Sequence, residues 1–266
     1  MVCQHFPRLP EGGAMRSIRR LFQYGLLFLV GCTENIPNPD DMNRYEKAVY
    51  DSDRWRSDRA RDEARKPDQV LAFAQLEPGM RVVDLLGGGG YYTEILSHIV
   101  GPSGQVYLQN NSLFLRFSTE ELEKRLAKDR LPNVVRLDSE FADLKLPEQV
   151  DMIFIGLSYH DIYVPRDDPT IMTSREEFFP QLLGALKEGG KLLIIDHAGK
   201  PGSGISTTPK LHRIDEHYAK TDIEQAGFTF LGSLDVLRNP NDNYDVNIWN
   251  KAVHKNTDRF IYLFEK

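Results

Sequence analysis

The stretch Val82-Val83-Asp84-Leu85-Leu86-Gly87-Gly88-Gly89-Gly90-Tyr91-Tyr92-Thr93-Glu94 decides the fold of this chain. It begins as a short apolar run, passes through four consecutive glycines and ends in apolar residues at helical spacing. This order predicts a strand, a tight turn and a helix. Glycines suit a turn where the backbone bends sharply or lies against a ligand, because they carry no Cβ. The start of the following helix would point unpaired N–H groups at a ligand above the turn.

Strand patterns recur along the rest of the 266 residues. The sequence predicts further strands at 105–110, 133–137, 151–156, 191–195, 228–237 and 260–264. Helices are expected between them, among them one that starts at a capping box at Ser118 and runs to about Asp129, and one that covers 211–226. The alternation of strands and helices predicts an α/β fold.

Composition and charge describe an ordinary globular protein. The chain is 41% hydrophobic and 27% charged, with a net charge of -6. This balance argues against a surface that neutralises phosphates, so nucleic acid is not expected as a partner. Charges of both signs alternate densely at 43–66, and this pattern predicts a solvent-exposed helix over the site entrance or along the sheet.

The glycine stretch resembles motif I of the class I methyltransferases, which bind S-adenosylmethionine (SAM). The usual form is Asp-x-Gly-x-Gly-x-Gly; Asp84, Gly88 and Gly90 match it, Leu86 takes the place of the first glycine, and Gly87 is additional. The resemblance implies a Rossmann-like seven-stranded sheet, mostly parallel with a reversed last strand, and helices on both faces. It also implies SAM as the cofactor.

A second resemblance lies in Leu186-Lys187-Glu188-Gly189-Gly190 followed by a strand. Together the motifs are similar to a bacterial group of predicted methyltransferases that often carry export signals. The resemblance implies cofactor contacts from the turn and the residues beside it: Asp84, Gly87, Gly88, Gly89, Gly90 and Tyr91.

Two more cofactor contacts are implied at the ends of the next strands. Asn110 stands where many methyltransferases have an acid that binds the ribose hydroxyls, and Glu140 would bond the adenine amino group. The alternatives are a plain strand-end asparagine and a solvated turn.

Candidate catalytic residues follow the fourth and fifth predicted strands, which deliver Tyr159-His160-Asp161 and Asp196-His197. In open α/β sheets ligands bind at the carboxyl ends of strands. A histidine beside a carboxylate can act as a general base, so His160 is the first choice for that role, with Asp161 or Asp196 orienting it and Tyr159 and His197 nearby. His212 is expected to face the same pocket; the alternative for His160 is a structural loop histidine.

A metal site is not predicted, because the histidines lack His-x-x-His spacing and lie in separate loops. Three functions stay open. The first is methyl transfer from SAM to an unknown acceptor, a small molecule or an envelope component. The second is a non-catalytic SAM- or ligand-binding envelope lipoprotein, favoured by Leu86 and Asn110. The third, a nicotinamide-dependent oxidoreductase, is disfavoured because its fingerprint would need glycine at Tyr92.

The first residues resemble an export signal. A basic segment at 15–20 precedes an apolar run and Leu29-Val30-Gly31-Cys32, which resembles a bacterial lipoprotein box. The apolar run is too short to span a membrane. We therefore expect an upstream extension, signal and linker at 1–35 and a methyltransferase-like domain at 36–266.

The signal sets the expected location. A lipid on Cys32 would anchor the chain to the cell envelope, facing the periplasm; the chain would be cytoplasmic if the signal is not used. Arg19-Arg20 resemble a twin-arginine signal, whose route carries folded proteins. Met15 is an alternative start to Met1.

Overall fold

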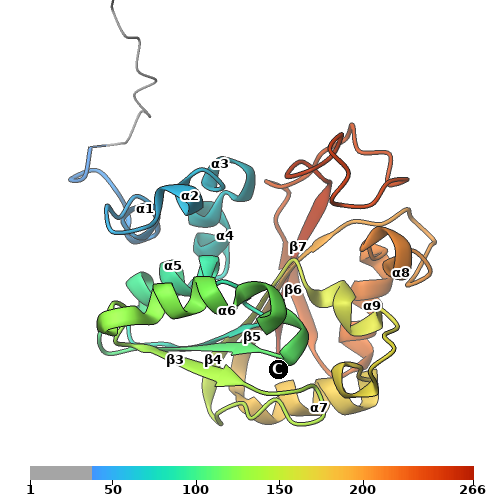
Figure 1. Ribbon diagram of the computed structural model, residues 1–266, viewed down its shortest axis with the longest axis horizontal. Coiled ribbons are helices and arrows are strands. Elements are labelled where there is room, and N and C mark those ends of the chain that lie inside the picture. The colour runs from blue at the N-terminus through green and yellow to red at the C-terminus, as the bar shows by residue number, and fades with distance from the viewer. Residues whose placement is uncertain (1–37) are drawn as a thin grey trace, which may run out of the picture. The chain divides into compact units, whose positions relative to one another are not determined.

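Seven strands form one sheet in the order β3-β2-β1-β4-β5-β7-β6 (Figure 1). The computed structural model describes residues 38–266. Strands β1 to β5 pair in parallel, and β7 runs antiparallel to both of its neighbours, so the predicted reversed last strand is confirmed. The strands are β1 (Arg81–Leu85), β2 (Gln105–Asn110), β3 (Val134–Asp138), β4 (Val150–Gly156), β5 (Leu186–His197), β6 (Thr229–Ser233) and β7 (Arg259–Glu265).

Helices cover both faces of this sheet, as predicted (Figure 1). The α-helices are α1 (Arg44–Val49), α2 (Arg56–Arg59), α3 (Asp62–Arg65), α4 (Pro67–Phe73), α5 (Tyr91–Val100), α6 (Ser112–Leu126), α7 (Arg175–Ala185), α8 (Thr208–Leu211) and α9 (Glu216–Gln225). Short 3-10 turns lie at Ala127–Asp129, Tyr159–Tyr163 and Pro169–Ile171.

Two apolar cores lie on opposite faces of the sheet. Strand β4 shows the alternation: Ile153 and Ile155 join the core under α7 and α9, whereas Met152 and Phe154 join the core under α1, α4 and α5. Successive side chains of a strand point to opposite faces, and a strand covered on both faces must be apolar throughout. Each such buried side chain contributes about 1.5–3 kcal/mol relative to exposure.

The glycine turn between β1 and α5 has the predicted position and an unexpected strain. Leu86, which stands where the motif has its first glycine, adopts φ 55° and is buried. A side chain in this left-handed region costs roughly 1–2 kcal/mol, a cost that glycine does not carry. The turn therefore keeps the backbone path of the motif with a leucine in place.

Two predicted helices begin elsewhere. Helix α6 starts at Ser112, capped by Asn111, and Ser118 lies inside it with its hydroxyl donating to the Phe114 carbonyl at 2.8 Å. A serine bonded back to the preceding turn is compatible with the helix interior, so the capping-box pattern was misleading. The helix predicted at 211–226 is interrupted at His212, which adopts φ 52° between α8 and α9.

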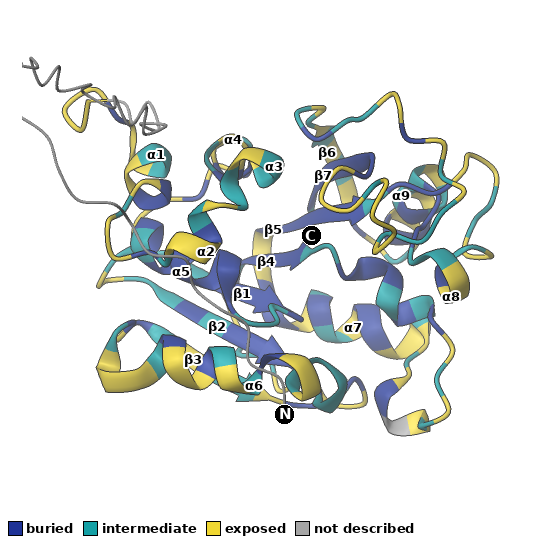
Figure 2. Cartoon of the chain, turned by 45° about the horizontal axis from the view of Figure 1, so that its top comes forward, coloured by how far each residue is buried: buried dark blue, intermediate teal, exposed yellow. Residues whose placement is uncertain are grey.

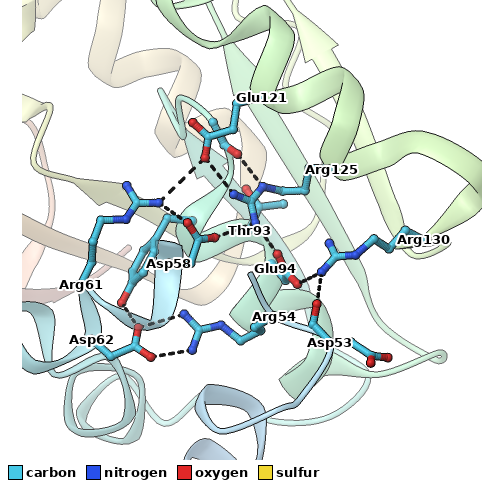
Figure 3. A network of polar contacts seen from close by, with 12 residues as sticks. Asp53, Arg54, Asp58, Arg61, Asp62, Thr93, Glu94, Glu121, Arg125 and Arg130 are labelled. Atoms are coloured by element: carbon cyan, nitrogen blue, oxygen red, sulfur yellow. Dashed lines mark hydrogen bonds and ion pairs between the residues drawn. The ribbon is translucent and has the colours of Figure 1, made fainter. Parts of the chain in front are cut away.

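The segment predicted as an exposed helix at 43–66 is three short helices, and its charges are partly buried. Arg54 and Asp58 are among the buried residues, in an ion-pair network with α5 and α6 (Figure 3). Arg125 of α6 pairs with Asp58 at 2.8 Å and with Glu94 of α5. Buried charges are stable only when paired, and charges alternating along a segment cannot reveal partners that lie far along the chain.

The strands at the centre of the sheet are more deeply buried than the helices and loops around them. The central strands are buried along their length, and exposed residues gather on the outer sides of the helices and on the loops (Figure 2). No helix of residues 38–266 is long and apolar enough to cross a bilayer. The predicted signal, Cys32 and the boundary after residue 35 lie outside the described residues.

Candidate functional site

A pocket of about 790 Å³ opens at the carboxyl ends of the central strands. Gly88 of the glycine turn lines it together with His160, Asp161, His197 and His212. Parallel strands bring their carboxyl ends to one edge of the sheet, so segments far apart in the sequence meet where this class of fold binds ligands.

His160 is held firmly in this pocket by Asp196. It is 1% exposed, its Nδ1 lies 2.8 Å from Oδ1 of Asp196, and its backbone N–H donates to Oδ2 of the same carboxylate at 2.6 Å. Asp196, near the end of β5, is fully buried. A carboxylate accepts hydrogen bonds, so this contact places the ring hydrogen on Nδ1 and leaves Nε2 as the basic atom, which faces His212 and Asp161.

Asp161 and His212 surround that basic atom. Nε2 of His160 lies 3.2 Å from Nδ1 of His212 and 3.7 Å from Oδ2 of Asp161. One ligand atom from each of the three residues lies within 4.8 Å of the others, so they could reach one metal ion. However, the two histidines already share a hydrogen bond, and Arg166 donates to Asp161 at 2.8 Å. This competition favours proton handling over cation binding.

Local charges give the histidines different pKa values. Burial lowers the pKa of His160, but the charge and hydrogen bond of Asp196, with the charge of Asp161, outweigh it and the pKa is raised. Burial, followed by the charge of His160, holds the pKa of His197 well below its ordinary value. His160 can take up a proton while His197 stays neutral, and such separation is typical of acid–base sites.

The glycine turn offers backbone to the same pocket. Gly88 has φ 57°, and a Cβ built on it meets nothing within 4 Å. A Cβ on Gly89 would lie 2.3 Å from the Glu121 carboxylate, and one on Gly87 would lie 2.7 Å from Oδ2 of Asp84. Gly88 therefore faces open space, whereas Gly87 and Gly89 make room for packing within the protein; Gly90, at φ 82°, leads into α5.

Polar atoms beside the turn retain capacity for a ligand. Oε1 of Glu140 accepts from the Ser112 N–H at 3.0 Å, whereas its Oε2 is buried without a partner. Nδ2 of Asn111 is also buried and unpaired, next to pocket residues Leu113 and Phe114. Buried polar atoms are normally paired, so these two atoms could bond a donor and an acceptor of a ligand, although neither residue lines the pocket itself.

Asn110 and Asp84 support the turn itself. The Asn110 amide accepts from the Gly88 N–H at 2.8 Å and donates to the Gly88 carbonyl at 3.0 Å. Asp84 accepts from the Thr93 hydroxyl at 2.5 Å, and burial raises its pKa to about 6. Asp84 does not line the pocket, so its side chain holds the turn to α5 from beneath.

Two predicted site residues point elsewhere. Tyr159, predicted beside the catalytic histidine, is fully buried and donates to Oδ2 of Asp222 on α9 at 2.6 Å. Tyr91, predicted as a cofactor contact, donates to Oδ1 of Asp62 on α3 at 2.6 Å. Both corrections have one cause: a buried tyrosine hydroxyl needs a partner, and in both cases a carboxylate from another helix supplies it.

Several pocket residues were not among the predicted site residues. Ile248 and Trp249 lie between β6 and β7, Arg65 ends α3, and Leu157 follows β4 with φ 65°. Arg65 belongs to the segment 43–66, predicted over the site entrance or along the sheet, and Leu157 lies two residues before the predicted Tyr159, whereas no prediction fell near Ile248 and Trp249. Only the placement of these segments over the strand ends makes them part of the site.

The fold and this site define a Rossmann-like methyltransferase, and comparison with known proteins agrees. The family model described as "Protein-L-isoaspartate(D-aspartate) O-methyltransferase (PCMT)" matches residues 65–200, just over half of the chain. A crystal structure of a SAM-dependent methyltransferase from Aquifex aeolicus has a TM-score of 0.56 at 24% identity, over 77% of this chain and 92% of that one. The [4+2]-cyclase SpnF, with a TM-score of 0.53 at 14% identity over 76% of this chain and 81% of that one, shares the fold.

Curated relatives are similar over a shorter region. The ubiquinone/menaquinone biosynthesis C-methyltransferase UbiE of Ectopseudomonas mendocina is 28% identical over 64% of this chain and 59% of the relative. Its counterpart in Shewanella piezotolerans is 34% identical over 51% and 49%. The chain spans about half to three fifths of the length of these relatives.

The chain belongs to the class I SAM-dependent methyltransferase family, and its cofactor is SAM. This membership sets aside the nicotinamide alternative.

Proposed function

We propose that this protein transfers a methyl group from SAM to a small acceptor that is apolar around its reactive atom and whose proton is taken up by His160. The observation that carries the proposal is the His160–Asp196 pair in a pocket that Gly88 of the glycine turn also lines. When bound, SAM supplies an electrophilic methyl group on its sulfonium. Gly88, Glu140 and Asn111 would hold it on the turn side of the pocket, opposite the histidines.

The residues of the chain then supply alignment and proton transfer. Asp196 keeps the ring hydrogen of His160 on Nδ1, so Nε2 can accept the proton of the acceptor. The 3.2 Å contact between Nε2 and Nδ1 of His212 offers a path by which the proton can leave. Holding two reactants in line removes much of the entropic barrier, and a positioned base contributes about a hundredfold or more. A base helps only an acceptor that still carries its proton, such as a hydroxyl group or an acidic C–H.

The pocket lining supports a small apolar acceptor. Six of its 13 lining residues have large apolar side chains: Leu113, Phe114, Phe117, Leu157, Ile248 and Trp249. Phe117 is 83% exposed and Trp249 is 61% exposed, so both offer apolar surface to a ligand. The UbiE relatives are named as methyltransferases of quinone biosynthesis, and an aromatic acceptor with an ionisable hydroxyl would suit this wall. The net charge of -6 supports the expectation that nucleic acid is not a partner.

The test uses the full chain and its single variants. We expect His160→Gln to lower methyl transfer from labelled SAM into cell-envelope extract by about a hundredfold, because general-base loss has that magnitude. SAM affinity should stay unchanged, because His160 lies on the acceptor side. His217→Gln is the matched control, since His217 has a 78% exposed side chain outside the pocket. Full activity in the His160 variant would leave this histidine with a structural role only.

The cofactor side has its own test. Gly88→Val would place a branched side chain into the open space above the turn, at a φ that favours glycine. We expect equilibrium dialysis to show no SAM binding by this variant. Unchanged SAM affinity would remove the turn from the cofactor site.

A second candidate function is a non-catalytic SAM-binding protein. Asn110 replaces the acidic residue expected at the end of β2, and both of its amide groups are used by Gly88. A ribose would therefore find a weaker acceptor there than a free carboxylate. SAM binding without methyl transfer into any envelope fraction would favour this candidate.

We further propose that a lipid on Cys32 anchors the protein in the cell envelope, facing the periplasm. The motivation is the Leu29-Val30-Gly31-Cys32 box after a short apolar run. Cys32→Ser should move the protein from the membrane pellet to the supernatant; a variant that still pellets would contradict the lipid anchor.

Because SAM is made in the cytoplasm, we infer that an active exported form leaves folded with SAM bound. Arg19→Lys with Arg20→Lys should then stop its export, and mature protein at the normal rate would exclude that route.

A further inference from the structure

A second hollow of about 310 Å³ adjoins the catalytic pocket. The two share Arg65, Leu157, His197, Ile248 and Trp249, so a ligand could extend from one into the other. The second hollow adds Lys255 and Arg259, and no acidic residue stands among the described residues that line it. Its charge is therefore positive, in a protein whose net charge is negative.

Arg259 is exceptional among the buried arginines of residues 38–266. Arg54, Arg125 and Arg213 are also buried, and each has a carboxylate partner at 2.7–2.8 Å: Asp62, Asp58 and Asp242 respectively. Arg259 is 6% exposed, and the only hydrogen bond of its side chain to a described residue is from Nε to the Thr257 carbonyl at 3.3 Å. No ion pair joins it to any described residue.

Arg65, which also lines the second hollow, likewise has no carboxylate partner among the described residues. It ends α3, is partly buried, and lies over the Tyr91 ring at 4.5 Å, without an ion pair among the described residues. Arg65 and Arg259 are close enough for each to disfavour the charge of the other, and burial together with this repulsion lowers the pKa of Arg259. An anion bound between the two guanidinium groups would offset this repulsion.

We propose that Arg65 and Arg259 form a subsite for a carboxylate or phosphate group carried by the methyl acceptor. A guanidinium group binds either anion through two parallel hydrogen bonds. Arg259 lines only the hollow away from Gly88, and this placement assigns the anion to the acceptor rather than to the amino-acid end of SAM. The inference rests on the proposed function, since it divides the acceptor into a reactive end near His160 and an anionic end near Arg259.

Equilibrium dialysis of the full chain with labelled inorganic phosphate tests the subsite without any methyl transfer. We expect one phosphate per chain, and at least about tenfold weaker binding in Arg259→Gln and in Arg65→Gln, because each removes charged hydrogen bonds. Arg56→Gln is the matched control, since Arg56 is exposed on α2. Phosphate binding that is absent from the wild-type chain, or equal in all variants, would overturn the proposal.

Thermal unfolding separates an anion-binding arginine from a structural one. Arg259 has no internal acidic partner, so Arg259→Gln should unfold at the same temperature as the wild type or higher in the absence of phosphate. Added phosphate should raise the unfolding temperature of the wild type but not of this variant. A variant that unfolds at a lower temperature and still binds phosphate would show that Arg259 is structural.

The source of the anion is tested with S-adenosylhomocysteine. Its affinity should be unchanged in Arg259→Gln and unchanged by saturating phosphate, because the donor would not occupy this hollow. Competition between the two ligands would assign the subsite to the donor and overturn the inference. His160→Gln should retain phosphate binding, so failure of the proposed base would not be mistaken for failure of the anion site.

Discussion

Two buried polar clusters lie on the same molecule and differ in chemistry. One is the ion-pair network that joins α2 and α3 to α5 and α6, in which Arg54, Asp58, Glu94 and Arg125 each have charged partners (Figure 3). The other is the cluster around His160 at the strand ends, which opens to a pocket of about 790 Å³. Both clusters bury charge, but only the second contains a nitrogen, Nε2 of His160, that can gain or lose a proton at the pocket.

The difference lies in the cation used. Arginine stays charged at every physiological pH, so a network closed by arginines can only hold the parts it joins. Imidazole gains and loses a proton near neutrality, and Asp196 directs that exchange to a single nitrogen of His160. The arginine network therefore stabilises the packing of the helices that it joins, whereas the His160–Asp196 pair can take part in proton transfer.

The largest expected effect comes from breaking the first cluster. Arg125→Met leaves Glu94 and Asp58 buried with reduced pairing. An uncompensated buried charge costs about 3–5 kcal/mol in free energy of unfolding, measurable by urea titration. Lys124→Met on the same helix is the control; its pair with Glu120 is exposed to solvent, so its loss should leave the unfolding free energy nearly unchanged. A similar loss in both variants would mean that burial does not distinguish these pairs.

Asp84 is a buried carboxylate without a cation partner among the described residues, so it can be compared with the paired carboxylates of the ion-pair network. Among the described residues Asp84 forms no ion pair, and burial raises its pKa to about 6 from 3.8. The folded state therefore holds this proton more tightly than the unfolded chain, so the contribution of Asp84 to stability is fully present below pH 3.8 and is lost as pH rises through about 6. The wild type should lose about 3 kcal/mol relative to Asp84→Asn between these limits, at about 1.4 kcal/mol for each tenfold change in proton affinity. A constant difference across this range, measured by urea titration, would show that Asp84 does not titrate there.

In the second cluster, the carboxylate behind the base should affect rate more than fold. Asp196→Asn would no longer fix the hydrogen on Nδ1 of His160, so we expect methyl transfer to fall by about a hundredfold or more. The comparison of kcat with SAM affinity is the measurement, and SAM affinity should not move. An equal loss in kcat and SAM affinity would indicate a collapsed pocket instead.

The smallest effect is expected at His212. Its contact with His160 at 3.2 Å is one hydrogen bond, with a net worth of about 1 kcal/mol, so His212→Asn should lower kcat by about five- to tenfold. Its unfolding free energy should stay close to that of the wild type, because His212 lies in a break between short helices. A loss as large as that of His160→Gln would make His212 the base.

The sequence predicted the parts of this fold that depend on local chemistry. The strand, glycine turn and helix at 81–100 lie where their pattern placed them. Pairing between distant segments was not predictable. Asp222 draws Tyr159 away from the pocket, and Arg125 buries charges of the N-terminal helices that alternate like a solvated face.

The histidine cluster was predictable in part. The rule that strand ends share one edge brought His160 and Asp196 together correctly. It could not show which nitrogen of His160 stays free, or that the unpaired Arg259 stands at the start of β7 opposite His197. Those facts depend on side-chain directions across the sheet.

Arg125 also connects two parts of the protein that the sequence separates. Its Nε donates to the carbonyl of Gly89 at 2.5 Å, while its Nη1 contacts both Asp58 of α2 and Glu94 of α5. Any ligand that orders the glycine turn therefore also favours the docked position of residues 54–65, and by reciprocity the docked segment strengthens ligand binding. Amide hydrogen exchange at 54–65 should slow when SAM is added, although these residues include few that line its pocket.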